Sequence, residues 1–123
     1  MDDGGTDGFD NLHFGRDGDV LVVTIDRPGS DLNAVDDRLH HELSRLFRRL
    51  QAEREARAVL LCGTETAFSA GGDFAWFPEL QEPGRLADLR LDAKSLIWDL
   101  LDVHLPVVCA LTGHAMGLGA SVA

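Results

Sequence analysis

The sequence predicts an α/β protein in which helices connect neighbouring strands. Three short apolar runs have the composition of buried strands, and two longer segments between them repeat their apolar residues with the period of a helix. The order is therefore strand, helix, strand, helix, strand, which favours crossover connections within one sheet. With 123 residues, the chain has the length of a single domain.

The first strand signal lies at residues 20–25. This run is apolar, rich in β-branched side chains and followed by turn-forming residues at 26–30. Asp17 and Gly18, just before it, form a pair that is typical of tight hairpin turns. We therefore expect a short partner strand at about residues 12–14, joined to the first strand by this turn.

From Asp36 onward, the apolar residues take up the period of a helix. They recur at spacings of three and four, and charged residues fill the positions between them, so one face is apolar. The segment is predicted to be an amphipathic helix whose apolar face consists of Leu39, Leu43, Leu46, Phe47 and Leu50.

The second half of the chain repeats this alternation. We expect a buried strand at residues 58–62, an irregular segment at 64–73 and a helix over about 86–102. Pro106 enforces a break before a third strand at residues 107–111. The inner face of the second helix is predicted to consist of Leu86, Leu89, Ala93, Leu96, Ile97, Leu100 and Leu101.

The charge is acidic and unevenly distributed. The chain has 21 acidic and 11 basic side chains, for a formal net charge of −10. Six acidic residues and one basic residue fall within residues 1–20, so this stretch carries half of the net charge. We interpret residues 1–11 as an acidic, flexible tail and residues 12–123 as the folded part. Because the chain repels phosphate on average, nucleic acid is not an expected partner.

Composition also predicts the compartment. No apolar run approaches the roughly 18 residues that span a bilayer, and no secretory signal is visible, so no membrane partner is expected. Cys62 and Cys109 lie in apolar runs and are expected to be buried free thiols. These features predict a soluble, cytoplasmic protein. The final residues resemble the first turn of a helix without a closing signal, so we expect the C-terminal half of the domain to be absent.

Two glycine-rich segments, residues 67–74 and 112–119, are candidate ligand-binding loops. Glycines let a backbone approach a ligand closely and leave N–H groups free to point at it. One such loop is more simply a tight turn. Two of them, each after a predicted strand, favour a site in which two backbone donors stabilise one oxyanion. Phe74, Trp76 and Phe77 fit core packing and the apolar wall of an acyl pocket equally well.

The sequence does not match the motifs of several other kinds of site, because the residues that these motifs require are spaced differently here. The glycines at 113, 117 and 119 do not follow the G-x-G-x-x-G order of a dinucleotide site, and the single lysine, Lys94, lies in a predicted helix rather than in a phosphate-binding loop. No serine occupies a G-x-S-x-G turn. His40 and His41 are adjacent and so face different sides of a helix, and no metal site is predicted.

Three segments together resemble the enoyl-CoA hydratase/isomerase (crotonase) family. Arg27-Pro28, followed by Leu32-Asn33-Ala34, resembles its early R-P-x-x-x-N-A segment, with one more residue between the two parts. Residues 67–73 read A-F-S-A-G-G-D and resemble its A-F-[SC]-[AS]-G-[AG]-D loop. Residues 106–119 resemble its P-x-[IV]-A-x-[VL]-x-G-x-[AC]-x-G-G-G segment. The similarity runs from about residue 12 to the end of the chain, and the motifs occur in the family's order.

The resemblance implies a crotonase-like (ClpP/crotonase) spiral of ββα units, truncated here. It also implies an acyl-CoA thioester as the ligand and a homotrimer or hexamer when the protein is full length. Coenzyme A is then part of the substrate, so no separate cofactor and no metal are expected. Arg27, Arg38, Arg85 and Arg90 are candidates to compensate the coenzyme's negative charge, although each is more simply a surface charge.

By the same resemblance, the backbone N–H groups of Gly72 and Leu118 would form an oxyanion hole. The Ala70 carbonyl would lie near the adenine, and Asp73 would cap the first loop rather than react. Residues 33–34 would line the path of the coenzyme. The full set of implied substrate-binding residues is Asn33, Ala34, Ala70, Gly71, Asp73 and Gly117.

Ser121 is a departure from the family pattern. Hydratases of the family carry a glutamate two residues after the last glycine of the second loop, and here that position is Ser121. A hydroxyl does not hold a catalytic water as a carboxylate does, so hydration, isomerisation, hydrolysis and decarboxylation all remain open. The expected function is an acyl-CoA lyase or isomerase of fatty acid metabolism that stabilises a thioester enolate. The alternative is a catalytically silent acyl-CoA-binding or assembly protein on the same scaffold.

Overall fold

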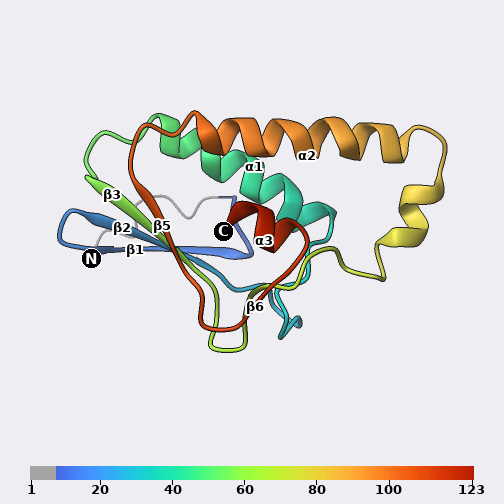
Figure 1. Cartoon of the computed structure of the whole chain (residues 1–123), viewed down its shortest axis with the longest axis horizontal. Coiled ribbons are helices and arrows are strands. Elements are labelled where there is room, and N and C mark those ends of the chain that lie inside the picture. Colours follow the sequence, from blue (N-terminus) through green and yellow to red (C-terminus); the bar gives the residue numbers. More distant parts are fainter. Residues whose placement is uncertain (1–7) are drawn as a thin grey trace.

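The computed structural model describes residues 8–123 and consists of repeated ββα units (Figure 1). This repeat confirms the predicted α/β class. A short 3₁₀ helix, η1, spans Phe77–Gln81. The units are β1 (Leu12–Asp17), β2 (Val20–Ile25) and α1 (Asp37–Gln51); β3 (Ala58–Cys62), β4 (Ala67–Ser69) and α2 (Arg85–Leu101); and β5 (Val107–Ala110), β6 (His114–Ala115) and α3 (Leu118–Val122).

The strands form two sheets. The larger has the order β1-β2-β3-β5, with an antiparallel β1–β2 hairpin and parallel β2–β3 and β3–β5 pairs. The predicted hairpin and crossovers are therefore confirmed, although β1 extends to Asp17 rather than ending at residue 14. The smaller sheet pairs β4 with β6 in parallel. The prediction of an irregular segment at 64–73 missed β4, because a strand of three residues is too short to show a period.

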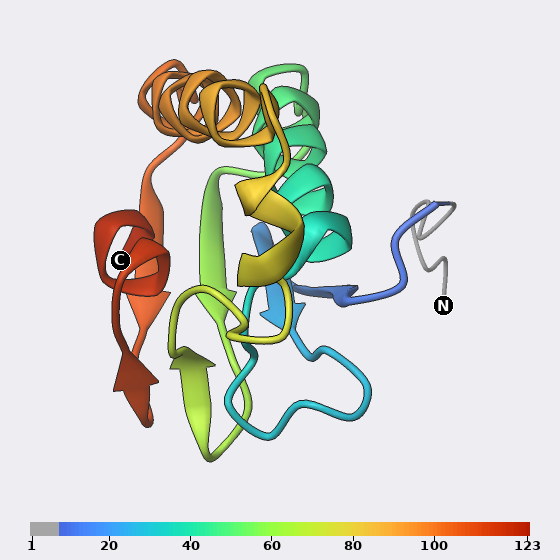
Figure 2. The same ribbon diagram turned by 90° about the vertical axis from the view of Figure 1, so that its right-hand side faces the viewer.

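Helix α1 covers one face of the larger sheet, with α2 beside it (Figure 2). Its N-cap is Asp36, whose carboxylate accepts a hydrogen bond from the Leu39 N–H at 2.9 Å. The predicted apolar face is confirmed in full, since each of its members is at least 97% buried. These residues are Leu39, Leu43, Leu46, Phe47 and Leu50.

The predicted inner face of α2 is only partly correct. Leu96 is fully buried, and the residues around it at 89, 93, 97 and 100 are half-buried. Leu86 and Leu101 were expected to face the core, but they are 55% and 67% exposed. Both lie at the ends of the helix, and the first turn of α2 extends beyond α1 (Figure 1). At Leu86, in this first turn, the apolar period therefore continues past the surface that α1 provides.

The chain packs onto α1 earlier than predicted. Residues 8–11 were assigned to a flexible tail, yet Asn11 is buried and Phe9 packs against the core. The buried carboxylate of Glu42 accepts hydrogen bonds from the backbone N–H groups of Asp10 and Asn11, both at 2.9 Å. The guanidinium of Arg38 donates a third bond at 2.9 Å. The remainder of the predicted tail, residues 1–7, lies outside the described residues.

This buried carboxylate predicts an acid-sensitive stability. Burial alone would raise the pKa of Glu42, but the hydrogen bonds from Asp10, Arg38 and Asn11 outweigh it and hold that pKa below its ordinary value of 4.5. The resulting stabilisation is present above pH 4.5 and is lost as the pH falls through the lower folded-state pKa. We expect Glu42→Gln to cost about 1–3 kcal/mol at pH 7 and to flatten this acid dependence, as measured by urea unfolding.

The matched control for that prediction is Glu65→Gln, because Glu65 is an exposed glutamate. It should leave both the stability at pH 7 and the acid dependence unchanged. An acid dependence that is equally steep in wild type and Glu42→Gln would contradict the assignment.

Three further features of residues 8–123 concern the cysteine thiols, possible metal-binding groups and membrane-spanning helices. Cys62 and Cys109 are free, as predicted, but half-buried rather than buried. Within residues 8–123, no group of three or more His, Cys, Asp or Glu side chains is placed to hold a metal ion. None of the helices in this range has the length and apolar character needed to cross a bilayer.

Candidate active site

The pairing of β4 with β6 brings the two glycine-rich loops into contact. Ser69 lies opposite Ala115, and the Ser69 carbonyl accepts a hydrogen bond from the Met116 N–H at 3.0 Å. Just beyond, a Cβ atom on Gly71 would lie 2.9 Å from the Met116 carbonyl oxygen and 3.4 Å from Gly117 Cα. A side chain at residue 71 would therefore push the loops apart, and its φ of +89° also favours glycine.

Helix α3 makes an equally close contact with β4. A Cβ atom on Gly119 would lie 2.1 Å from the Ser69 carbonyl oxygen, far inside van der Waals contact. Only glycine at residue 119 allows α3 to approach β4 this closely. The approach places Leu118, the first residue of α3, next to the first loop.

Two backbone donors are left without partners where the loops meet. Among residues 8–123, neither the Gly72 N–H nor the Leu118 N–H donates a hydrogen bond. On either side of Gly72, the Gly71 carbonyl accepts from the Val35 N–H at 2.7 Å, and the Asp73 N–H donates to the Val35 carbonyl at 2.8 Å. In a parallel bridge of this kind, the N–H of the central residue points away from the partner strand. The N–H of Leu118 is free because a first-turn residue has no acceptor within its helix.

Residues 33–34 were expected to line the coenzyme's path, and within this segment the Asn33 side chain is fully buried. Its Nδ2 donates to the carbonyls of Ile25, Ala67 and Phe68 at 2.8, 3.2 and 3.2 Å, and its Oδ1 accepts from the Arg27 N–H at 2.9 Å. The side chain therefore joins the end of β2 to β4 and does not reach a ligand. Sequence reasoning could not separate these roles, because a buried amide and a ligand-binding amide look alike in a motif.

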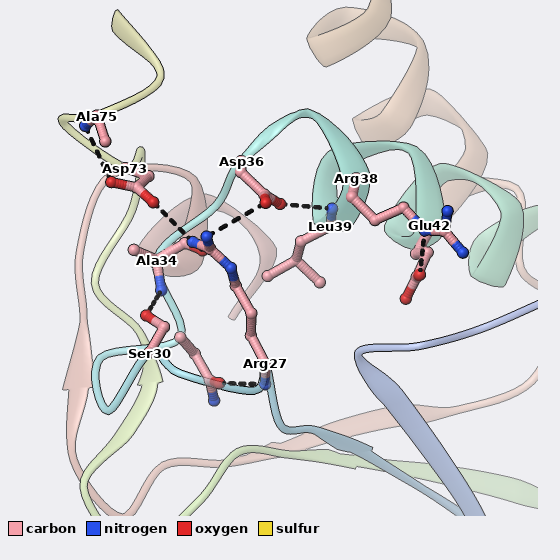
Figure 3. Close-up of polar contacts among 10 residues, drawn as sticks. Arg27, Ser30, Ala34, Asp36, Arg38, Leu39, Glu42, Asp73 and Ala75 are labelled. Carbon is pink, nitrogen blue, oxygen red and sulfur yellow. Dashed lines mark hydrogen bonds and ion pairs between the residues drawn. The ribbon is translucent and has the colours of Figure 1, made fainter.

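Asp73 closes the first loop, in agreement with its expected capping role. Its Oδ1 accepts from the Ala75 N–H at 3.0 Å, and its Oδ2 pairs with Arg27 Nη1 at 2.8 Å. The hydrogen bond from Arg27, followed by that from Ala75, lowers the pKa of Asp73. Arg27 was a candidate for the coenzyme's charge, but its guanidinium turns inward to this carboxylate (Figure 3).

A groove of about 800 Å³ lies beside Asp73, along the first half of α1. Asp73 and Trp76 line it, together with charged side chains of both signs from α1. Neither Gly72 nor Leu118 contributes to its wall, so it is not the space in which the two free N–H groups would meet a ligand.

Comparison with known proteins decides the family. The sequence model described as enoyl-CoA hydratase/isomerase matches residues 15–123. The chain belongs to the enoyl-CoA hydratase/isomerase family. A carnitinyl-CoA dehydratase from Citrobacter koseri is 33% identical over 115 residues, which cover 93% of this chain and 42% of that protein. The chain therefore spans less than half the length of this curated relative.

Solved structures confirm the crotonase fold. An enoyl-CoA hydratase/isomerase from Mycobacterium paratuberculosis superposes with a TM-score of 0.81 at 37% identity, over 91% of this chain and 45% of that one. DspI from Pseudomonas aeruginosa superposes with a TM-score of 0.84 at 24% identity, over 98% and 45%. The partial coverage is consistent with the expectation that only part of the family's spiral is present.

The aromatic residues after the first loop of this family member divide into two groups. Trp76 is buried, which fits core packing. Phe74 is 83% exposed and Phe77 is 43% exposed, with their ring centroids 5.5 Å apart. A Cβ atom on Gly72 would lie 2.8 Å from Phe77 Cε1, so this ring stands directly beside one of the two free donors. Phe77, with the Phe74 ring packed edge-on against it, thus presents an exposed apolar surface beside Gly72.

Ser121 lies one turn into α3, where the family resemblance would place a glutamate. Its hydroxyl is exposed and donates to the Gly117 carbonyl at 3.2 Å. This local bond uses the hydroxyl proton within the helix itself, as serines in helices often do. Within Leu118–Val122 there is no acidic side chain, and the position at which the resemblance would place a glutamate carries a hydroxyl.

We therefore expect Ser121→Ala to leave function unchanged. The substitution removes an exposed hydroxyl that is bonded only to its own helix, so acyl-CoA affinity and any turnover should stay within about two-fold of wild type. Calorimetric titration and a thioester turnover assay measure both quantities. A ten-fold loss of turnover with unchanged affinity would instead show that the Ser121 hydroxyl takes part in the reaction.

Proposed function

We propose that this chain binds an acyl-CoA thioester and stabilises its enolate form. The backbone N–H groups of Gly72 and Leu118 would donate together to the thioester oxygen. The observation that supports this proposal is the presence of two unpartnered N–H groups on loops whose backbones touch at Gly71 and Gly117. Membership of an acyl-CoA enzyme family points to the same ligand.

The chemistry follows from where negative charge develops. When a base removes the α-proton of a thioester, the electron pair of the C–H bond delocalises onto the carbonyl oxygen. Two fixed N–H donors stabilise that oxygen more strongly in the enolate than in the neutral thioester, so they lower the barrier rather than merely bind. Removal of one such donor typically costs about 3–4 kcal/mol of transition-state stabilisation.

The acyl group would lie against Phe74 and Phe77. Their exposed rings offer an apolar surface beside Gly72, and aromatic faces also attract quaternary ammonium groups. Because curated relatives are named carnitinyl-CoA dehydratases, carnitinyl-CoA, which carries a trimethylammonium group, is the first specific thioester to test.

A second candidate function is acyl-CoA binding without catalysis. The observation that favours it is Ser121, a hydroxyl at the position where the family resemblance would place a glutamate. The two candidates differ in what the donors do: a catalytic site prefers an enolate, whereas a simple binding site does not discriminate between an enolate and a neutral thioester.

Calorimetric titration with two ligands separates these outcomes. Acetoacetyl-CoA ionises readily to an enolate, whereas butyryl-CoA stays a neutral thioester of nearly the same size. The proposed site should bind acetoacetyl-CoA at least ten-fold more tightly, with the ultraviolet absorbance of the bound enolate increasing in parallel. Equal affinities would favour the binding protein, and no heat with either ligand would contradict both functions.

A further inference from the structure

We infer that Arg27 is a positioning residue that holds the Gly72 N–H in its donor orientation by clamping the two backbone segments around it. This inference rests on the proposed function, because it assigns Arg27 a role in the same site. Arg27 does not touch the oxyanion position itself. Its contacts are with the chain on both sides of the Val35–Gly72 bridge.

By itself, the Val35–Gly72 bridge would hold the Gly72 N–H in place only weakly. It consists of two hydrogen bonds to Val35, at 2.7 and 2.8 Å, and it is isolated from both sheets. A single pair of backbone bonds outside a sheet contributes little net stability, since each replaces a bond to water. Gly71 and Gly72 add further backbone freedom on one side of it. Before Gly71, the two segments are also joined by the Ala70 N–H, which donates to the Leu32 carbonyl at 2.9 Å, and by the Ser69 hydroxyl, which donates to the Asn33 carbonyl at 2.8 Å. Both bonds precede the two glycines, so Gly72 keeps one orientation only if the segments are also held together beyond it.

The Arg27 guanidinium contacts both segments at once (Figure 3). Nη1 donates to the Ala34 carbonyl at 2.7 Å and to Asp73 Oδ2 at 2.8 Å, and Nη2 pairs with Asp36 Oδ2 at 3.2 Å. Ala34 and Asp36 are the two neighbours of Val35, and Asp73 directly follows Gly72. The planar fork of an arginine reaches these three acceptors together, which the single point charge of a lysine does not do.

Partial burial of the three charged side chains strengthens the interactions between them. The side chains of Arg27, Asp36 and Asp73 are only 20%, 30% and 24% exposed, so water screens their charges less than it screens a surface pair. Asp36 also caps α1 through the Leu39 N–H. Arg27 therefore links the loop that contains Gly72 to the start of α1. Because α1 is packed on the sheet, this link restricts the movement of the loop.

A ligand-free measurement tests the clamp directly. In the 123-residue chain, we expect Arg27→Lys to speed hydrogen exchange of the Val35 and Asp73 amides about ten-fold or more, while β2 amides keep their wild-type rates. Arg38→Lys is the matched control, because Arg38 also pairs with a carboxylate, that of Glu42, but belongs to neither loop. It should leave the Val35 and Asp73 amides unchanged. Wild-type exchange of these two amides in Arg27→Lys, or equal acceleration across the sheet, would overturn the inference.

Affinities then test the role in function. Arg27→Lys should lower the preference for acetoacetyl-CoA over butyryl-CoA by about ten-fold, with butyryl-CoA affinity retained, because only an oriented donor distinguishes an enolate. A preference that stays at the wild-type ratio would overturn the positioning role. A wild-type chain with no preference would contradict the proposed function instead, and hydrogen exchange would still confirm or overturn the clamp.

Discussion

Replacing Leu118 with proline should abolish the preference for an enolate ligand. Leu118 is the first residue of α3, a position at which proline fits helix geometry and removes no helical hydrogen bond. The substitution therefore deletes one proposed donor with little effect on the backbone. We expect the affinities for acetoacetyl-CoA and butyryl-CoA to become equal, a relative loss of at least about ten-fold, because one of the two donors to the oxyanion is gone.

The matched control is Leu118→Ala. Both variants lose the partly buried leucine side chain, which packs against the core, but only the proline variant loses the N–H group. Leu118→Ala should keep the wild-type preference for acetoacetyl-CoA. If the two variants discriminate between the ligands equally well, the Leu118 N–H is not a donor to the thioester oxygen.

Gly119→Ala should damage both stability and ligand discrimination. The new Cβ atom would lie 2.1 Å from the Ser69 carbonyl oxygen, and this obstacle is backbone in a buried strand rather than the movable end of a side chain. Helix α3 would have to move away from β4 and carry Leu118 with it. We expect a loss of about 3 kcal/mol in unfolding free energy and the loss of enolate preference in the protein that remains folded.

Gly15→Ala provides the comparison for this prediction. A Cβ atom at Gly15 meets nothing within 4 Å, and the residue has an ordinary backbone conformation. Its unfolding free energy and ligand preference should stay close to those of wild type. A Gly119→Ala protein with wild-type stability would show that α3 and β4 are not packed as described.

The elements that sequence predicted well are those with long, repeated patterns. The apolar face of α1 from Leu39 to Leu50 was identified residue by residue, because five apolar positions on one helix face leave little choice of orientation. The same pattern placed Glu42 on the polar side, although Glu42 is buried. Its burial depends on residues 10–11, more than 30 positions away, and such a partner leaves no trace in the local period.

The site was predictable to the level of its loops but not of its side chains. Glycine spacing located both loops, and pairing of β4 with β6 explains why they meet. Residues 33–34 were expected to line the coenzyme's path, and Arg27 was read as a surface charge or a candidate partner for the coenzyme, yet the side chains of Asn33 and Arg27 join segments within the protein. A motif records which residue is present at a position, whereas its direction depends on acceptors supplied by distant segments, here Ile25 and Asp73.

The central claim is that the N–H groups of Gly72 and Leu118 donate to one thioester oxygen. The most direct test is to follow both amide resonances by NMR in a ¹⁵N-labelled chain during titration with acetoacetyl-CoA. The account predicts that both resonances move downfield with the same saturation curve, while the amide of Gly15 stays in place. Binding that shifts only one of the two amides, or neither, would contradict it.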